Sequence, residues 1–373
     1  MKIGVIVHGP GIIDSGCAKK IIDILKDYGQ VTCRLGGTMG RTAVIDANLE
    51  DIINIEDKLL PSESIKLLSE DNDVLFLLNY GKSTITGHTF GYKVLNNAGK
   101  DINLIQIERP KEEDGVIIQW NNHDNRYILE ELSQRLSLKV ISSEEVTKIV
   151  EDLTGFNRDN DFVERKVAGV SPDENIMMNG IIIGKVTADS LTIIAENNRI
   201  TKMIGGKIKQ HGIEKLGKVD LTKAIIKTGL LRTSDNIKPR RMEHHPNKQL
   251  KAVFLNHAAE DIYKYKDADI LVSIGDDTTL LSSDILYRFN IPVIGITDGD
   301  LDKVVLHGFK LDESLIIQLE SGYDDIIGKK IYEEIFNKND EKTIKSINSL
   351  KKDILNLISD TSIRYTIVDK QLK

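Results

Sequence analysis

Cysteine, long apolar runs and a leader pattern are what this sequence lacks. Its two cysteines, Cys17 and Cys33, are too few for a disulfide framework and too far apart for a metal knuckle. No apolar run reaches the roughly 18 residues that a membrane-spanning helix needs. The opening stretch MKIGVIVHGPG enters a strand pattern directly, with no signal-peptide region. We therefore expect a cytoplasmic protein with reduced thiols and no membrane partner.

A surplus of positive charge is also missing. The 57 acidic residues outnumber the 50 basic ones, and the resulting net charge of −7 argues against a protein that coats nucleic acid. Apolar residues make up 40% of the chain and charged residues 29%, as in ordinary globular proteins. A chain of 373 residues is longer than a single hydrophobic core usually supports, so it should contain more than one domain.

Short Val/Ile/Leu-rich runs alternate with amphipathic stretches at both ends of the sequence. This alternation predicts βαβ units, and we expect an α/β protein with two Rossmann-like parallel-sheet domains. Between them, short strands and polar turns predict a small β-rich (α+β) segment. The predicted boundaries are 1–153, 154–232, a polar linker at 233–249, and a C-terminal domain at 250–373 that ends in helices. The spacing of apolar residues also predicts a helix within 207–232, and a charged helix is expected at about 341–358.

Acidic turns follow two successive strands of the C-terminal domain. Asp276 and Asp277 follow the strand ILVSIG, and Asp298, Asp300 and Asp302 follow the strand IPVIGIT. Neighbouring strands lie about 4.8 Å apart, so the two turns should bring several carboxylates to one crevice. A hard cation such as Mg²⁺ relieves the repulsion of such carboxylates and attracts phosphate oxygens.

The sequence therefore predicts a site for Mg²⁺ and a nucleotide or other phosphorylated small molecule. Asp276, Asp277, Asp298 and Asp300 are the expected metal ligands, and Asp277 is also the candidate catalytic base. Gly275, Thr278 and Thr279 would contact the phosphate at the helix N-terminus. A plainer interpretation is that Asp277 caps the helix and that TDGD is a solvated turn.

Glycine-rich turns follow several strands of the N-terminal domain. Glycines let backbone N–H groups approach an anion, and Arg and Lys add charge, so a binding role is expected at this edge. GKS at 81–83 is no P-loop, because Phe76 stands where the motif requires glycine. The stretch IERP also places Glu108 and Arg109 at a strand end. The candidate binding residues are Gly9, Gly36, Gly37, Gly40, Arg41 and Lys82.

The segment ILVSIGDDTTLLSSDILYRFNIPVIGITDGDLDKV resembles the GGDGT segment of NAD kinases and diacylglycerol-kinase-like folds. Gly275 matches the first glycine, Asp277 the acid and Thr279 the threonine, while Asp276 and Thr278 replace the other two glycines. The resemblance covers about 35 residues, and the β-rich part precedes the segment here instead of following it. It implies a nucleotide-type crevice but not NAD phosphorylation.

A resemblance that covers the whole chain is closer. HGPGIIDSG, LGGTMGRTAVIDANLED, LNYGKSTITGHTFG and HGIEKLGKVDL, with the GDDTT and TDGDLD turns, resemble an uncharacterised family of archaeal, chiefly methanogen, proteins. That family is a domain of unknown function, so this resemblance implies no activity.

Three functions from different classes are compatible with these patterns. The first is an Mg²⁺-dependent phosphotransferase or hydrolase, and the second is a nucleotide or cofactor sensor without chemistry. The third is a Toprim-like nucleic-acid enzyme, suggested by the acidic turn of GITDGDLD, although the required glutamate on an earlier strand is not apparent. Neither the substrate nor the oligomeric state follows from these patterns.

Overall fold

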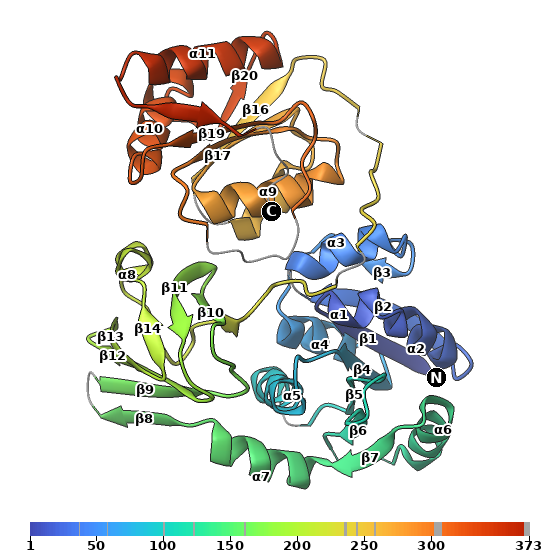
Figure 1. The fold of residues 1–373 in the computed structure, drawn as a ribbon. Coiled ribbons are helices and arrows are strands. Elements are labelled where there is room, and N and C mark those ends of the chain that lie inside the picture. The colour runs from blue at the N-terminus through green and yellow to red at the C-terminus, as the bar shows by residue number, and fades with distance from the viewer. Residues whose placement is uncertain are drawn as a thin grey trace. The chain divides into compact units, whose positions relative to one another are not determined.

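The computed structural model describes residues 1–36, 38–57, 59–99, 101–121, 124–159, 162–234, 237–243, 245–256, 259–301 and 308–368. The protein has a mixed α/β fold whose sheets contain parallel strands (Figure 1). The chain divides into two compact units, residues 1–238 and 239–373, and the division falls within the polar stretch 233–249. None of the described helices is long and apolar enough to cross a membrane.

A seven-stranded sheet, here called sheet A, forms the first part of unit 1 and has the order β3-β2-β1-β4-β5-β6-β7. Its strands are β1 (Lys2–His8), β2 (Gln30–Gly36), β3 (Ile53–Asn54), β4 (Val74–Asn79), β5 (Leu104–Glu108), β6 (Val116–Gln119) and β7 (Lys139–Ser142). The strands β1 to β5 are parallel to one another, whereas β6 runs antiparallel to β5. The run GVIIQW, at residues 115–120, thus departs from the parallel pattern expected for this domain, because β6 runs antiparallel to β5 and pairs in parallel only with β7.

Helices cover both faces of sheet A, which explains why its strands are almost continuously apolar. Alternate residues of β1 belong to opposite cores: Val5 packs with α1, α2, α3 and α6, and Ile6 packs with α4, α5 and α7. The helices are α1 (Gly11–Asp14), α2 (Cys17–Leu25), α3 (Thr38–Asp46), α4 (Pro61–Ser69), α5 (Thr84–Ala98), α6 (Arg126–Leu136) and α7 (Ser143–Leu153).

Two four-stranded antiparallel sheets complete unit 1, as the predicted β-rich segment requires. Their elements are β8 (Phe156–Asp159), β9 (Phe162–Val167), β10 (Asn175–Met178), β11 (Ile181–Val186), β12 (Leu191–Glu196), β13 (Arg199–Ile204), β14 (Gly206–Ile208), α8 (Gln210–Leu216) and β15 (Ile226–Thr228). The prediction of a helix within 207–232 is mostly wrong. Helix α8 ends before Gly217, whose φ of +64° stops the helix, and β15 follows.

A six-stranded sheet, here called sheet D, forms the centre of unit 2, with the order β20-β16-β17-β18-β19-β21. Its elements are β16 (Lys251–Asn256), η1 (Ala259–Tyr265), β17 (Ile270–Ile274), α9 (Asp276–Tyr287), β18 (Val293–Thr297), β19 (Leu315–Leu319), α10 (Asp324–Lys330), η2 (Ile331–Ile335), β20 (Glu341–Thr343), α11 (Ile347–Ser359) and β21 (Tyr365–Ile367). The strands β16 to β19 are parallel, and the two edge strands are antiparallel. The predicted charged helix from 341 is wrong at its start, because residues 341–343 extend the sheet and Ser346 caps α11.

Candidate functional site

The acidic turns of unit 2 lie at the carboxyl ends of neighbouring parallel strands, β17 and β18. The strand register pairs Ile274 with Ile296, so Asp276 and Asp298 each stand two residues beyond a paired position. One carboxylate oxygen each from Asp276, Asp298 and Asp300 lies within 4.8 Å of the others. We call these three residues the acidic cluster. The prediction that Asp276 or Asp277 comes close to Asp298 or Asp300 is therefore confirmed for Asp276, and the role of these residues as metal ligands stays a prediction.

Backbone amides hold two carboxylates of the acidic cluster in place. The Asp276 carboxylate accepts hydrogen bonds from the amide of Asp298 at 3.0 Å and from that of Gly299 at 3.2 Å. Asp298 Oδ2 in turn accepts from the amide of Gly322, beyond β19, at 2.6 Å. These bonds join the ends of three strands and hold the carboxylates of Asp276 and Asp298 in place.

Burial raises the pKa of Asp276 to about 6, and the neighbouring Asp298 carboxylate adds to the rise. The backbone amides of Asp298 and Gly299 act in the opposite direction but do not cancel it. A raised carboxyl pKa means that negative charge is costly at this position. The arrangement suits a hard cation with oxygen ligands, because a cation would offset that cost.

The remaining predicted residues of this segment lie outside the acidic cluster. Helix α9 begins at Asp276 with Gly275 at the N-cap, so the interpretation of Asp277 as N-cap is wrong. Gly275 has a φ of +94°, which glycine adopts readily. Asp277 is half-buried in the first turn of α9, and its catalytic role stays a prediction.

Thr278 and Thr279 are buried, and the Thr279 hydroxyl lies 2.8 Å from that of Ser273 on β17. Thr279 also packs against Gly295 of β18, where a Cβ atom would lie 2.2 Å from the Thr279 methyl group. This packing locks α9 onto the sheet, so Thr279 positions the helix that carries Asp276. Asp302 lies outside the described residues.

The predicted binding residues of unit 1 make separate contacts along sheet A. Arg41 Nη2 donates to the Glu56 carbonyl at 3.4 Å, whereas Lys82 Nζ contacts Glu174 Oε2 at 2.5 Å and Thr228 Oγ1 at 2.7 Å in the β-rich part. The described glycines have structural reasons of their own: Gly9 has a φ of +76°, Gly36 packs on Pro61 and Gly40 packs on Leu35. Gly37 lies outside the described residues. A common anion site around Arg41 and Lys82 stays a prediction.

A buried polar network lies at the carboxyl edge of sheet A, and the sequence patterns indicated Glu108 at a strand end without linking it to His8 or Asn79. The last residues of β1, β4 and β5 are His8, Asn79 and Glu108, and the strand register pairs each with the next. Asn79 Oδ1 lies 2.8 Å from His8 Nδ1, and Asn79 Nδ2 donates to Glu108 Oε2 at 2.8 Å. A polar residue in the final position of three buried strands was the signal that could have revealed this network.

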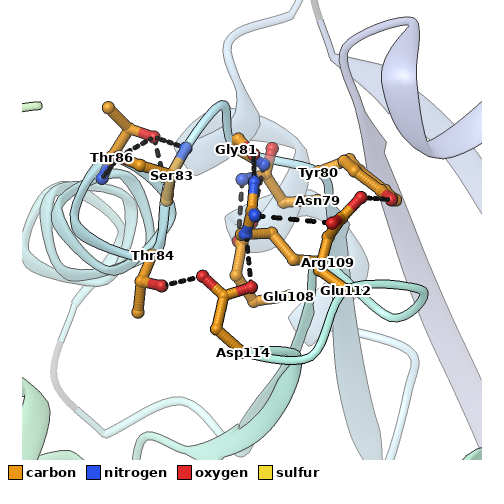
Figure 2. A network of polar contacts seen from close by, with 10 residues as sticks. All are labelled: Asn79, Tyr80, Gly81, Ser83, Thr84, Thr86, Glu108, Arg109, Glu112 and Asp114. Carbon is orange, nitrogen blue, oxygen red and sulfur yellow. Dashed lines mark hydrogen bonds and ion pairs between the residues drawn. The ribbon is translucent and has the colours of Figure 1, made fainter. Parts of the chain in front are cut away.

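Glu108 anchors the loop after β4, as Figure 2 shows. It is fully buried, and its carboxylate accepts from the Gly81 amide at 2.6 Å and from Gln106 Nε2 at 2.7 Å. Burial raises the pKa of Glu108 against the effect of these donors. Arg109, with a φ of +49°, donates to the Gly81 carbonyl at 2.6 Å and to Asp114 at 2.9 Å. The loop therefore has a fixed conformation.

The fold and the acidic cluster define a mixed α/β protein with polar residues gathered at the carboxyl edges of two sheets. Residues 5–339 match the model of a family described as an uncharacterised protein conserved in archaea (DUF2117), and the chain belongs to this family. It is 44% identical over 371 residues to an uncharacterised protein of Methanocaldococcus jannaschii, which covers 98% of this chain and 99% of that protein. No solved structure matches the chain. The predicted archaeal family is thereby confirmed.

Proposed function

We propose that unit 2 binds Mg²⁺ at the acidic cluster and, through the cation, a nucleotide or another phosphorylated small molecule. The observation that carries the proposal is the approach of three carboxylate oxygens, from Asp276, Asp298 and Asp300, to within 4.8 Å of one another. They lie at the carboxyl ends of adjacent parallel strands, where open α/β sheets bind ligands. The parallel strands β16 to β19 at the centre of sheet D agree with this assignment.

The chemistry of the donors supports Mg²⁺ over softer cations. Mg²⁺ is bound by one or two carboxylates, keeps several waters and completes its shell with substrate phosphates. Asp276 Oδ1 and Asp298 Oδ2 each accept from one backbone amide and therefore keep a second lone pair for a cation. Asp276 and Asp298 would hold the cation directly, and exposed Asp300 would hold it directly or through water. Bound Mg²⁺ would supply positive charge to orient phosphate oxygens.

The experiment is titration of the full chain with MgCl₂ by calorimetry at pH 7.5. Asp276→Asn and Asp298→Asn should lower Mg²⁺ affinity at least tenfold, because each removes a charged ligand. Asp312→Asn is the matched control, since Asp312 is an exposed aspartate of the same unit outside the cluster. Absence of Mg²⁺ binding to the parent protein, or equal affinity in all three variants, would contradict the proposal.

Two further measurements identify the ligand and test whether the protein catalyses a reaction. A nucleotide panel should raise the thermal midpoint of the parent protein only when Mg²⁺ is present, and not that of Asp298→Asn. Release of phosphate from a bound nucleotide would identify an enzyme, whereas binding without turnover would identify a sensor. Salt-dependent binding of DNA or RNA would instead favour the Toprim-like alternative.

A further inference from the structure

A second polar site lies in unit 1, at the point where the strand order of sheet A reverses. The chain passes from β1 to β2 on one side and continues from β4 to β5 on the other. The loops after β1 and β4 therefore diverge, and such a switch point is where open α/β sheets bind ligands. His8 and Asn79 are the last residues of these two strands and are register partners.

Hydrogen bonds around Glu108 determine how the Asn79 amide is oriented. The Trp120 indole can only donate, and its Nε1 lies 3.0 Å from Gln106 Oε1, so Gln106 Nε2 faces Glu108. The Gly81 amide is a second donor to the same carboxylate. Glu108 thus acts as an acceptor, and Asn79 meets it with Nδ2. This orientation leaves Asn79 Oδ1, an acceptor, facing His8.

The Asn79 orientation determines the tautomer of His8. Because Oδ1 of Asn79 accepts, His8 Nδ1 must carry the proton of their 2.8 Å hydrogen bond. The imidazole also stacks on Phe90 of α5, with ring centroids 3.9 Å apart and planes 19° from parallel. The ring is therefore fixed, and Nε2 carries the lone pair. Within the described residues Nε2 makes no hydrogen bond, and the side chain is partly exposed.

Positive charge from the β-rich part lies near this imidazole. Burial lowers the pKa of His8 to about 4, and the charge of Lys227 on β15 lowers it further, while the Asn79 hydrogen bond opposes the decrease. His8 is consequently neutral at pH 7. Next to Lys227 on β15, Thr228 contacts Lys82 of the loop after β4. Lys82 is itself ion-paired with Glu174, so the positive charge acting on His8 is that of Lys227. A neutral acceptor near this charge fits a ligand that carries both a hydrogen-bond donor and a negative charge.

We propose that His8 contacts a ligand at this switch point, where Nε2 accepts a hydrogen bond from a hydroxyl group of an anionic small molecule of the sugar-phosphate type. Asn79 and Glu108 are positioning residues that hold the tautomer, and Lys227 attracts the anion. All residues of this site belong to unit 1, whereas the acidic cluster belongs to unit 2.

The tautomer is tested first, on the full chain labelled with ¹⁵N-histidine. Long-range ¹H–¹⁵N spectra at pH 7.5 should show His8 with a protonated Nδ1 and an unprotonated Nε2, with the signal assigned by its loss in His8→Gln. His211→Gln, at an exposed histidine of α8, is the matched control. In Asn79→Leu the preference for the Nδ1–H form should be lost. A protonated Nε2 in the parent protein would overturn the proposal.

The ligand is tested with ribose 5-phosphate, ribose and sulfate as probes in the same spectra. Ribose 5-phosphate should shift the Nε2 resonance and bind at least tenfold more tightly than ribose or sulfate, and His8→Gln should lower that affinity at least tenfold. No response to ribose 5-phosphate, or an equal response to sulfate, would overturn the proposal. Asp298→Asn should respond like the parent, so a failure here is distinguishable from failure at the acidic cluster.

Discussion

The carboxyl edges of sheets A and D surround their carboxylates with different neighbours, although burial raises the pKa of both Glu108 and Asp276. At Glu108, three donors from Asn79, Gly81 and Gln106 surround one carboxylate. In the acidic cluster, backbone amides instead hold carboxylates against one another, and the pKa of Asp276 rises to about 6. A carboxylate that has enough donors stabilises its loop, whereas crowded carboxylates create a demand for a cation.

Removing the Glu108 carboxylate should have the largest effect on stability. Glu108→Ala leaves the amide of Gly81 and the side chains of Asn79 and Gln106 without their buried acceptor, and we expect a loss of about 3 kcal/mol in the free energy of unfolding of unit 1. Urea unfolding followed by Trp120 fluorescence measures it, because the single tryptophan lies in the same network. Glu108→Gln, which keeps one acceptor oxygen, should lose less. Equal stability of Glu108→Ala and the parent would contradict the account of this network.

Much of this organisation could be predicted from the sequence because buried strands and their turns have strong local patterns. Val/Ile/Leu runs such as VLFLLN and ILVSI indicated the central strands, and the acidic turns after β17 and β18 indicated the cluster. Parallel strands necessarily end at one edge, so local patterns sufficed to bring Asp276 near Asp298.

The network around His8 and Glu108 could not be derived in the same way. It depends on the order of β1, β4 and β5 within the sheet and on their register, which short-range patterns do not contain. The spacing in 207–232 likewise indicated a longer helix, but Gly217 ends α8 and tertiary pairing makes residues 226–228 a strand. Tertiary contacts decide such cases because local propensities are weak.

The second largest expected effect, after that of Glu108→Ala, is a fall in Mg²⁺ affinity at low pH. Because the pKa of Asp276 is about 6, the proton competes with the cation at and below that pH. Apparent Mg²⁺ affinity should be nearly constant above pH 7 and fall by up to about tenfold per pH unit below 6, where one proton must be displaced. Calorimetric titration between pH 5 and 8 measures this dependence, with circular dichroism to verify that the fold persists. A constant affinity from pH 5 to 7 would show that Asp276 is not a ligand.

The smallest expected effect is the change in the free energy of unfolding that Asp276→Asn causes in the absence of Mg²⁺. The folded-state pKa of Asp276, about 6, lies above its ordinary value of 3.8, so protonated Asp276 favours folding below about pH 4. That contribution disappears as the pH rises through 6. The variant, which cannot ionise, should therefore gain stability relative to the parent between pH 4 and 7, by on the order of 1 kcal/mol after solvent screening.

Thermal unfolding in EDTA at pH 4, 5.5 and 7 measures this difference, and Asp312→Asn is again the control because its side chain is exposed. Saturating Mg²⁺ at pH 7 should reverse the order, since the parent binds the cation at least tenfold more tightly than the variant. A variant that is less stable than the parent at pH 7 in EDTA would mean that the amides of Asp298 and Gly299 fully compensate the ionised carboxylate. The acidic cluster would then resemble Glu108 and would have no electrostatic need for a cation.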